Sequence, residues 1–320
     1  MPNSLTSSSS TSGTSSGSTP GSGGFGASAP SAAGGAKVTM SDRQFADLRK
    51  IIYERSGIHF PDTKKYILES RLGHRLAELE LDDFGQYVDL LSMGPYQNEE
   101  FQEMFNRITI NETSFFRNEP QLDVFEKRIL PDLLEARKGS KSLRLWSAAC
   151  SSGEEPYTLA MQLHRSLGVR LSDWKVEILG TDISERVLEI AASGRYTDYA
   201  LRSTPPLIKS RYFKQDGSYW NLDPTIRSMV TFDLHNLKDR LAARRLGTWD
   251  VIFCRNVLIY FDDAMKKQVV NMFGEQLADD GYLFIGHSET IRTGEAPLIP
   301  LPIPQAFAYV KPQHPRKPTA

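Results

Sequence analysis

The sequence has 320 residues, room for two domains and a tail, and its 38 Lys and Arg residues offset 39 Asp and Glu residues to a formal net charge of -1. Without a basic excess, we expect no broad nucleic-acid-binding surface. The chain has no basic-then-apolar leader and no apolar run near the ~18 residues that cross a bilayer, so we expect a soluble, cytoplasmic protein with no membrane insertion.

The only cysteines are Cys150 and Cys254, which are too far apart for a zinc-binding pattern. Both lie near the ends of predicted strands, where Cys behaves as a small apolar residue. We therefore expect two buried free thiols and no metal site.

Residues 1–36 are almost entirely Ser, Gly, Thr, Ala and Pro, a composition that predicts a disordered tail. Residues 37–108 then predict a small helical domain, with helices at about 41–57, 61–79, 84–91 and 98–108. Ser41 and Gln44 have the spacing of a capping box, and Gly57 marks the end of the first helix.

Three basic residues of the second predicted helix fall along one line, because they are separated by seven and four positions: Lys64, Arg71 and Arg75. The line is either an ordinary solvated face or a docking face for an acidic partner. Steering and orientation are what such a face would supply.

Residues 109–312 alternate between predicted strands and helices, and 313–320 form a C-terminal tail. A polar turn at 111–117 precedes a helix at 119–136. A strand at 143–146 is followed by small residues as far as Gly153 and by a helix that begins at Glu154; a second strand, 175–183, ends in Asp182. Such a turn offers free N–H groups to a ligand, and an acid at the second strand tip grips ribose hydroxyls. This stretch predicts half of a nucleoside-binding site.

The charge of the turn indicates which nucleoside fits. The dinucleotide fingerprint Gly-x-Gly-x-x-Gly is absent, since only Gly153 stands there. Glu154 and Glu155 would repel a pyrophosphate at this position. S-adenosylmethionine, which has an α-ammonium and a sulfonium and no phosphate, suits the turn better than NAD.

The rest of the chain completes an α/β fold with a doubly wound, mostly parallel sheet. A helix is predicted at 184–192, strands at 229–234, 249–254, 282–286 and 306–310, and an antiparallel β insertion at about 194–228 with a turn at Asp216 and Gly217. The following residues come just after strand tips, at the carboxyl edge where open sheets bind ligands: Asn236, Leu237, Arg255 and Asn256. His287 is interpreted as a structural histidine rather than a base.

Several segments resemble the chemotaxis receptor methyltransferases, the CheR family, over roughly residues 40–311. The matching segments are NETSFFR at 111–117, SAACSSGEEPY at 147–157, GTDI at 180–183, NL at 236–237, FCRNVLIYF at 253–261 and GYLFIGHSE at 281–289. The resemblance implies a Rossmann-like class I S-adenosylmethionine-dependent methyltransferase behind a helical domain that docks on glutamate-rich receptor helices. It favours the docking reading of Lys64, Arg71 and Arg75.

The same resemblance implies the site. The cofactor-binding residues would be Asn111, Thr113, Arg117, Glu154, Asp182, Asn236, Leu237, Arg255 and Asn256. Glu154 suits the ammonium, with Glu155 as the less favoured substitute; Asp182 suits the ribose, and Leu237 would pack on the adenine. Arg117 and Tyr260 are implied to position the substrate.

Methyl transfer to a glutamate needs no general base, because the carboxylate is already ionised, with an ordinary pKa of about 4.3. The function expected is methyl esterification of receptor glutamates, with S-adenosylhomocysteine as product. The alternatives are a catalytically silent cofactor-sensing module and a nucleic-acid or small-molecule methyltransferase, the latter disfavoured by the charge balance. The insertion is compact between Phe213 and Val230, so we expect no tethering to a receptor's C-terminal peptide, and we expect a monomer.

Overall fold

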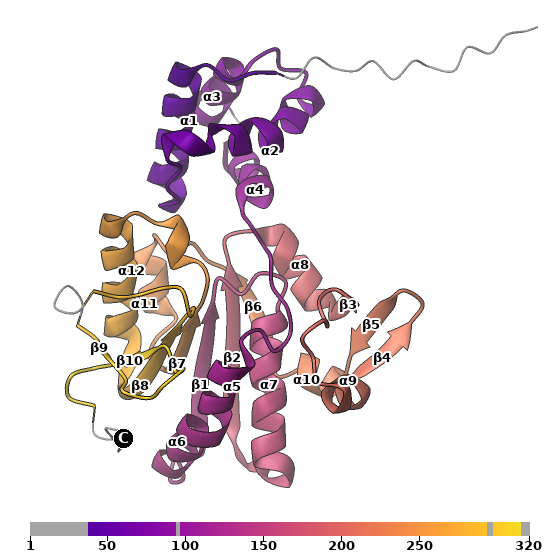
Figure 1. The fold of residues 1–320 in the computed structure, drawn as a ribbon, viewed down its shortest axis with the longest axis vertical. Helices are drawn as coiled ribbons and strands as arrows, with labels where there is room; N and C mark the ends of the chain where they lie inside the picture. Colours follow the sequence, from indigo (N-terminus) through magenta and orange to yellow (C-terminus); the bar gives the residue numbers. More distant parts are fainter. Residues whose placement is uncertain (1–37, 94–96, 293–296, 315–320) are drawn as a thin grey trace, which may run out of the picture. The chain divides into compact units, whose positions relative to one another are not determined.

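A computed structural model describes residues 38–93, 97–292 and 297–314, and Figure 1 shows the arrangement of its elements. The tail predicted at 1–36 and most of the tail predicted at 313–320 lie outside these residues. In the described part no helix is long and apolar enough to cross a bilayer, and no group of three or more His, Cys, Asp or Glu residues is placed to hold a metal ion. Cys150 and Cys254 are buried free thiols, as predicted.

The predicted N-terminal helices are all present. They are α1 (Asp42–Ser56), the 3₁₀ turn η1 (Asp62–Lys64), α2 (Lys65–Glu78), α3 (Phe84–Met93) and α4 (Gln97–Ile108). The capping box forms, since the Ser41 hydroxyl accepts the Gln44 N–H and the Gln44 side chain accepts the Ser41 N–H. At the other end of α1, Gly57 has a φ of 76°, the left-handed conformation that terminates helices. The inward faces of the helices meet in one buried cluster, so this part has its own core.

The helix predicted at 119–136 is present over these bounds, but a π-helical turn lies inside it. Its parts are α5 (Glu119–Val124), the π-helical η2 (Phe125–Ile129) and α6 (Leu130–Ala136). The cause is Pro131, which lacks an N–H for the helical ladder and crowds the preceding turn, so the helix widens before it. The widened turn places Phe125 edge-on against Phe253 and Phe284 of the sheet.

The main sheet has seven strands in the order β6-β2-β1-β7-β8-β10-β9. They are β1 (Ser142–Ala148), β2 (Lys175–Asp182), β6 (Val230–Leu234), β7 (Trp249–Cys254), β8 (Leu277–Ile285), β9 (Ile299–Pro300) and β10 (Ala308–Val310). The first five in spatial order pair in parallel, and β10 and β9 add antiparallel to the β8 edge. The prediction of a doubly wound, mostly parallel sheet is therefore confirmed.

Helices cover both faces of this sheet, which explains why its strands are buried on both sides (Figure 1). They include α7 (Glu154–Leu167), α8 (Glu185–Ser193), α11 (Arg240–Arg245) and α12 (Asp263–Gln276). The 3₁₀ helix η3 (Gly168–Asp173) follows α7 directly in the chain. Alternate residues of β1 join different clusters: Leu145 lies in the one that contains α7 residues, and Trp146 in the one that contains α12 residues. Parallel strands that feed crossover helices put every carboxyl end at the same edge.

The predicted insertion is a three-stranded antiparallel sheet in the order β3-β5-β4, from β3 (Arg195–Thr197), β4 (Phe213–Asp216) and β5 (Tyr219–Leu222). Its hairpin turns at Gly217, as expected. The short helices α9 (Pro206–Tyr212) and α10 (Pro224–Arg227) were not predicted; Pro206 and Pro224 each occupy their first position. Phe115 packs edge-on against Tyr196 and Phe213, joining the insertion to the 111–117 segment.

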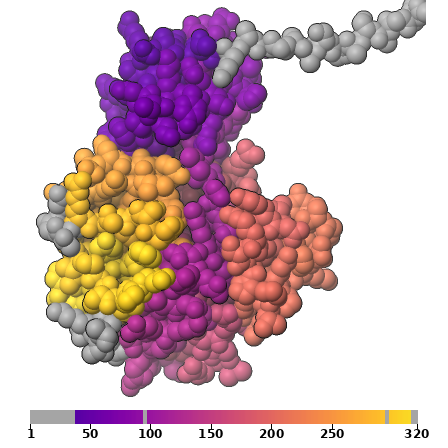
Figure 2. Space-filling view, in the orientation of Figure 1, coloured from indigo at the N-terminus to yellow at the C-terminus, as the bar shows by residue number. Residues whose placement is uncertain are grey.

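The N-terminal helices are hydrogen-bonded to residues at the carboxyl edge of the sheet. In Figure 2 their indigo atoms lie directly against the orange atoms of the C-terminal part of the chain. The Asn236 amide donates to the Arg55 carbonyl at 2.6 Å, near the end of α1. In the loop after α1, the His59 N–H donates to the Tyr260 carbonyl at 2.9 Å, and Ile58 forms a bridge with Phe261. The loop at 57–61 therefore lies against the segment that follows β7.

Candidate functional site

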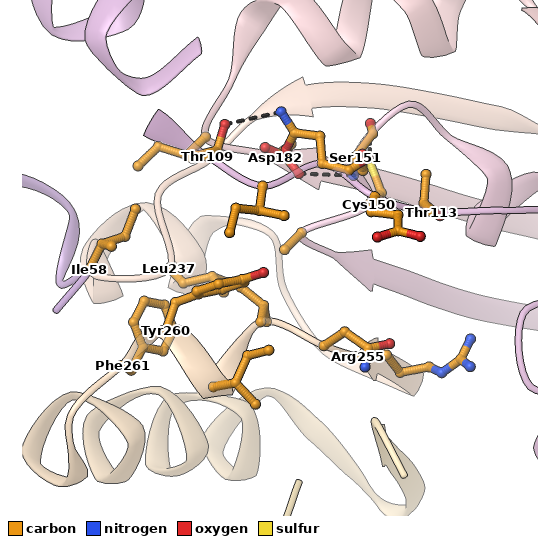
Figure 3. A pocket seen from close by; sticks show the side chains of 18 of the residues that line it. Ile58, Thr109, Thr113, Cys150, Ser151, Asp182, Leu237, Arg255, Tyr260 and Phe261 are labelled. Atoms are coloured by element: carbon orange, nitrogen blue, oxygen red, sulfur yellow. Dashed lines mark hydrogen bonds between the residues drawn. The ribbon is translucent and has the colours of Figure 1, made fainter. Parts of the chain in front are cut away.

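A cavity of about 350 Å³ opens at the carboxyl edge of the parallel strands, within the range of roughly 300–1,000 Å³ found for small-molecule sites. Figure 3 shows its wall, with Asp182 and Ser151 on one side of the view and Tyr260 and Phe261 on the other. Nine of the predicted site residues line it: Asn111, Thr113, Arg117, Asp182, Asn236, Leu237, Arg255, Asn256 and Tyr260. The topology brings these distant sequence positions together.

The turn after β1 is built from residues in the left-handed conformation. Ala149, Ser151 and Gly153 have φ values of 61°, 52° and 91°. A Cβ at Gly153 would lie 2.8 Å from the Ala191 side chain, so glycine is needed for close packing as well as for its φ. The Ser151 N–H donates to the Asp182 carboxylate at 2.9 Å, which ties the turn to the tip of β2.

Asp182 is almost fully buried and lines the cavity. Its other oxygen accepts the Ser184 N–H at 3.1 Å. Burial raises the pKa of this carboxyl, and the N–H donors of Ser184 and Ser151 oppose the shift. Since an ionised carboxylate has about four acceptor positions, Asp182 can accept two further hydroxyl donors from a ligand.

The two neighbouring glutamates point in different directions, because successive helical residues diverge by about 100°. Glu155 lines the cavity, where it accepts the Ser147 hydroxyl at 2.7 Å and pairs with Arg255 at 3.1 Å. Glu154 is not part of the cavity wall. It is buried with Ser152 as its hydrogen-bond donor, at 2.8 and 3.0 Å, and burial raises its pKa to about 7. Of the two glutamates, Glu155 therefore lines the cavity and Glu154, which the sequence favoured for the cofactor, does not.

Arg255 links three parts of the wall. One guanidinium nitrogen pairs with Glu155 and another donates to the Arg117 carbonyl at 2.7 Å. Its Nε is buried and has no hydrogen-bond partner among the described residues. Burial lowers the pKa of this guanidinium, and the Glu155 carboxylate opposes that shift. An arginine held this way orients both the β1–α7 turn and the loop that carries Arg117.

Arg117 and Tyr260 reach the cavity from different segments. One Arg117 N–H group donates to the Glu112 carbonyl at 2.9 Å, inside its own loop. Tyr260 is half-buried at the end of the 3₁₀ turn η4 (Leu258–Tyr260), and burial raises the pKa of its hydroxyl, opposed first by the charge of Arg117. A phenol with a raised pKa stays protonated near neutrality and can donate a hydrogen bond.

The remaining predicted residues serve the wall in different ways. Asn111 donates to the Thr109 hydroxyl at 3.0 Å. The Thr113 carbonyl accepts an N–H of Arg202. The Asn236 side chain donates to the Arg55 carbonyl and accepts the Lys238 N–H, so its amide is already bonded within the protein. Leu237 is buried and apolar, as a surface for a flat ring requires. His287 lies outside the cavity wall.

Two parts of the site were missed from sequence. The cavity wall includes the 56–61 loop of the helical domain, together with Thr109 and Ile110. No local motif marks these residues, because their place follows from how the helices dock on the sheet. The second is Glu289, whose buried carboxylate accepts backbone N–H groups beside the cavity. Its only signal was its place within the GYLFIGHSE segment.

The basic line on α2 is only partly available to a partner. Lys64 is exposed at the cavity rim. Arg71 donates to the carbonyls of Ile108 and Thr109 at 2.7 and 2.8 Å, and Arg75 is bound to the buried Glu100. Two of the three predicted docking residues, Arg71 and Arg75, thus bind groups at or near α4, and docking through this line stays a prediction.

Comparison with known proteins agrees with this geometry. Residues 43–109 match the model of the CheR methyltransferase all-alpha domain, and residues 111–306 match that of the CheR methyltransferase SAM binding domain. "Chemotaxis protein methyltransferase 2" of Vibrio cholerae is 37% identical over 80% of this chain and 88% of its own length. The "Chemotaxis protein methyltransferase" of Borreliella burgdorferi is 37% identical over 80% and 90%, and that of Escherichia coli is 37% identical over 79% and 86%. Both family models match in order, and together they span most of the chain. The chain therefore belongs to the CheR family of S-adenosylmethionine-dependent methyltransferases.

Proposed function

We propose that this protein transfers the methyl group of S-adenosylmethionine to glutamate side chains of chemoreceptors, forming glutamate methyl esters and S-adenosylhomocysteine. The observation that carries the proposal is one cavity lined both by Asp182, at the tip of β2, and by Arg117 with Tyr260. Asp182 suits the ribose of a nucleoside, and Arg117 with Tyr260 suits a carboxylate substrate. The curated relatives named as chemotaxis protein methyltransferases support the same activity.

The residues present fit the cofactor. When bound, it supplies a methyl group activated by a sulfonium. Asp182 keeps free acceptor positions for the ribose hydroxyls, and the apolar Leu237 suits the adenine face. We propose Glu155 for the ammonium, because it is the glutamate that lines the cavity, with Glu154 supporting the turn from behind through Ser152. Asn111, Thr113, Asn236 and Asn256 complete the wall.

At the substrate end, the chain's task is alignment rather than proton transfer. A glutamate carboxylate is ionised at neutral pH, with an ordinary pKa of about 4.3. Arg117 offers N–H donors that hold a carboxylate in a fixed plane, and Tyr260 donates its hydroxyl to the same group. The enclosing wall excludes water from the aligned groups. Arg117 must orient the carboxylate without suppressing its nucleophilicity, so we assign the finer positioning to Tyr260.

We propose that the helical domain presents the receptor helix to this cavity. Lys64, at the end of η1 and immediately before α2, is exposed at the rim and is the residue of the basic line that we propose meets acidic side chains. For the insertion, the two-residue hairpin between β4 and β5 supports the proposal that no receptor peptide is tethered there. That the protein acts as a cytoplasmic monomer stays a prediction.

The deciding experiment incubates the purified protein with chemoreceptors and tritiated S-adenosylmethionine. We expect label on receptor glutamates that base treatment releases as methanol. Label that resists base would overturn the proposal.

The alternative, a catalytically silent cofactor-binding module, is addressed by Arg117→Ala, which should abolish transfer and spare cofactor binding measured by calorimetry. A matched control is Arg170→Ala, on η3 behind α7; equal rates for all three proteins would favour the silent module.

A further inference from the structure

Glu289 follows β8 and is 5% exposed, yet it takes no part in the cavity wall. One carboxylate oxygen accepts the N–H groups of Asn256 at 2.8 Å and Gly286 at 2.7 Å, and the other accepts the Ile259 N–H at 3.3 Å. Within the described residues, every hydrogen bond to this carboxylate comes from the backbone. Bonds from N–H groups to an ionised acceptor are stronger than neutral ones, and they offset the cost of burying it.

These three bonds fix the loop that carries the substrate-facing residues. Asn256 has a φ of 60°, in the left-handed region that asparagine enters more readily than most residues with a side chain. Ile259 immediately precedes Tyr260. Gly286 leaves room for the arrangement, since a Cβ there would lie 2.7 Å from the Glu289 carboxylate and 3.0 Å from the Asn256 nitrogen.

Tyr260 is thereby held from two sides. Glu289 binds the N–H of the residue before it, and its own carbonyl accepts the His59 N–H from the helical domain. Without the carboxylate, the N–H groups of Asn256, Ile259 and Gly286 would lose their shared acceptor, and the loop would relax to find others. A small shift of the backbone at Ile259 moves the Tyr260 hydroxyl relative to the Arg117 guanidinium.

We infer that Glu289 is a positioning residue for methyl transfer: it sets the 256–260 loop so that the Tyr260 hydroxyl meets the substrate carboxylate. The inference rests on the proposed function, and it assigns Glu289 no contact with cofactor or substrate. Support that orients a reacting group from behind is needed because catalysis is sensitive to small misplacements.

The test is a double-mutant cycle on kcat for receptor methylation. Glu289→Gln keeps the shape of the side chain but presents an amide to one of the N–H groups, so we expect kcat to fall about tenfold. Tyr260→Phe should lower kcat in the natural background and have a much smaller effect in the Glu289→Gln background, because the hydroxyl is already misplaced. Independent, multiplying effects would overturn the inference.

The matched control is Asp250→Asn, which alters a buried carboxylate at the start of β7, at the opposite edge of the sheet, where it binds Arg137 and the Arg144 N–H. It should lower the melting temperature and leave kcat unchanged. If Glu289→Gln fails to fold, Gly286→Ala adds a Cβ against the Glu289 carboxylate and the Asn256 backbone nitrogen, and the cycle with Tyr260→Phe is run on that variant instead.

Hydrogen exchange separates failure of this inference from failure of the proposed function. Wild-type protein that methylates no receptor would overturn the proposed function alone. Amide exchange of the 256–261 segment, followed by mass spectrometry, still reports on the loop. Faster exchange there in Glu289→Gln than in Asp250→Asn supports the assignment, and unchanged exchange contradicts it.

Discussion

An arginine–glutamate pair in the helical domain and another at the cavity differ in how completely their hydrogen bonds are satisfied within the protein. Arg75 binds Glu100 through two nitrogens and Glu78 through a third, and the Tyr87 hydroxyl also donates to Glu100. Arg255 makes one bond to Glu155 and one to a carbonyl, and its Nε has no partner among the described residues. The first pair is saturated with protein partners. In the second pair, one guanidinium N–H group has no hydrogen-bond partner among the described residues.

The comparison predicts the largest effect at the saturated pair, and on stability alone. Glu100→Gln removes the negative charge to which Arg75 and Tyr87 donate hydrogen bonds, and we expect the free energy of unfolding to fall by about 3 kcal/mol. Chemical denaturation would measure it. The kcat of methyl transfer by the folded fraction should be unchanged, and a lower kcat would mean that the two pairs do not differ as described.

At the unsaturated pair, a smaller free-energy change should appear in activity. Arg255→Lys keeps the charge but cannot bind Glu155 and the Arg117 carbonyl together, because an ammonium lacks the planar arrangement of donors. We expect kcat/KM to fall about 100-fold, equivalent to ~2.7 kcal/mol. The melting temperature should move little. A variant with natural activity would show that Arg255 does not organise the site.

Glu155 and Glu154 offer a sharper contrast still, being neighbours in sequence. Glu155→Gln should weaken cofactor binding about tenfold, because it removes the carboxylate that faces the cavity. Glu154→Gln serves as its control and should leave the affinity near the natural value. Calorimetric titration with S-adenosylhomocysteine decides between them, and the reverse ranking would restore the original assignment to Glu154.

The smallest effect concerns pH. Because the Glu154 pKa is raised from 4.5 to about 7 in the fold, the folded protein holds this proton more tightly than the unfolded chain. The resulting stability is complete below pH 4.5 and is lost as the pH rises through about 7. Relative to Glu154→Gln, the natural protein should lose ~1 kcal/mol between about pH 6 and about pH 8. Parallel stability curves would show that Glu154 does not titrate there.

Local patterns predicted most of the fold. The Ser41–Gln44 capping box, the strand at 143–146 and the turn at Gly217 depend on residues within a few positions of one another, so they can be read from sequence. The carboxyl-edge rule then predicted five of the residues that line the cavity: Asp182, Asn236, Leu237, Arg255 and Asn256. The family resemblance supplied the other four: Asn111, Thr113, Arg117 and Tyr260.

What escaped prediction depends on distant contacts. The widened turn before Pro131 lets Phe125 reach Phe253, and the rotation of α7 decides that Glu155 rather than Glu154 faces the cavity. Arg71 and Arg75 looked like a free surface because their partners near α4 lie about 25 to 38 positions later in the chain. Neither propensity nor spacing contains that information.

The bond from the His59 N–H to the Tyr260 carbonyl has a consequence for how such proteins diversify. The loop that follows the first helix belongs to the proposed docking domain and also binds the carbonyl of Tyr260, the residue to which we assign substrate positioning. A chimera that exchanges only the first hundred or so residues with those of a relative would therefore change the rate of methyl transfer as well as the choice of receptor. Receptor specificity and catalytic rate are therefore coupled. We expect new receptor specificities to arise by substitutions on the outer surfaces of the helices rather than by replacement of the whole helical domain.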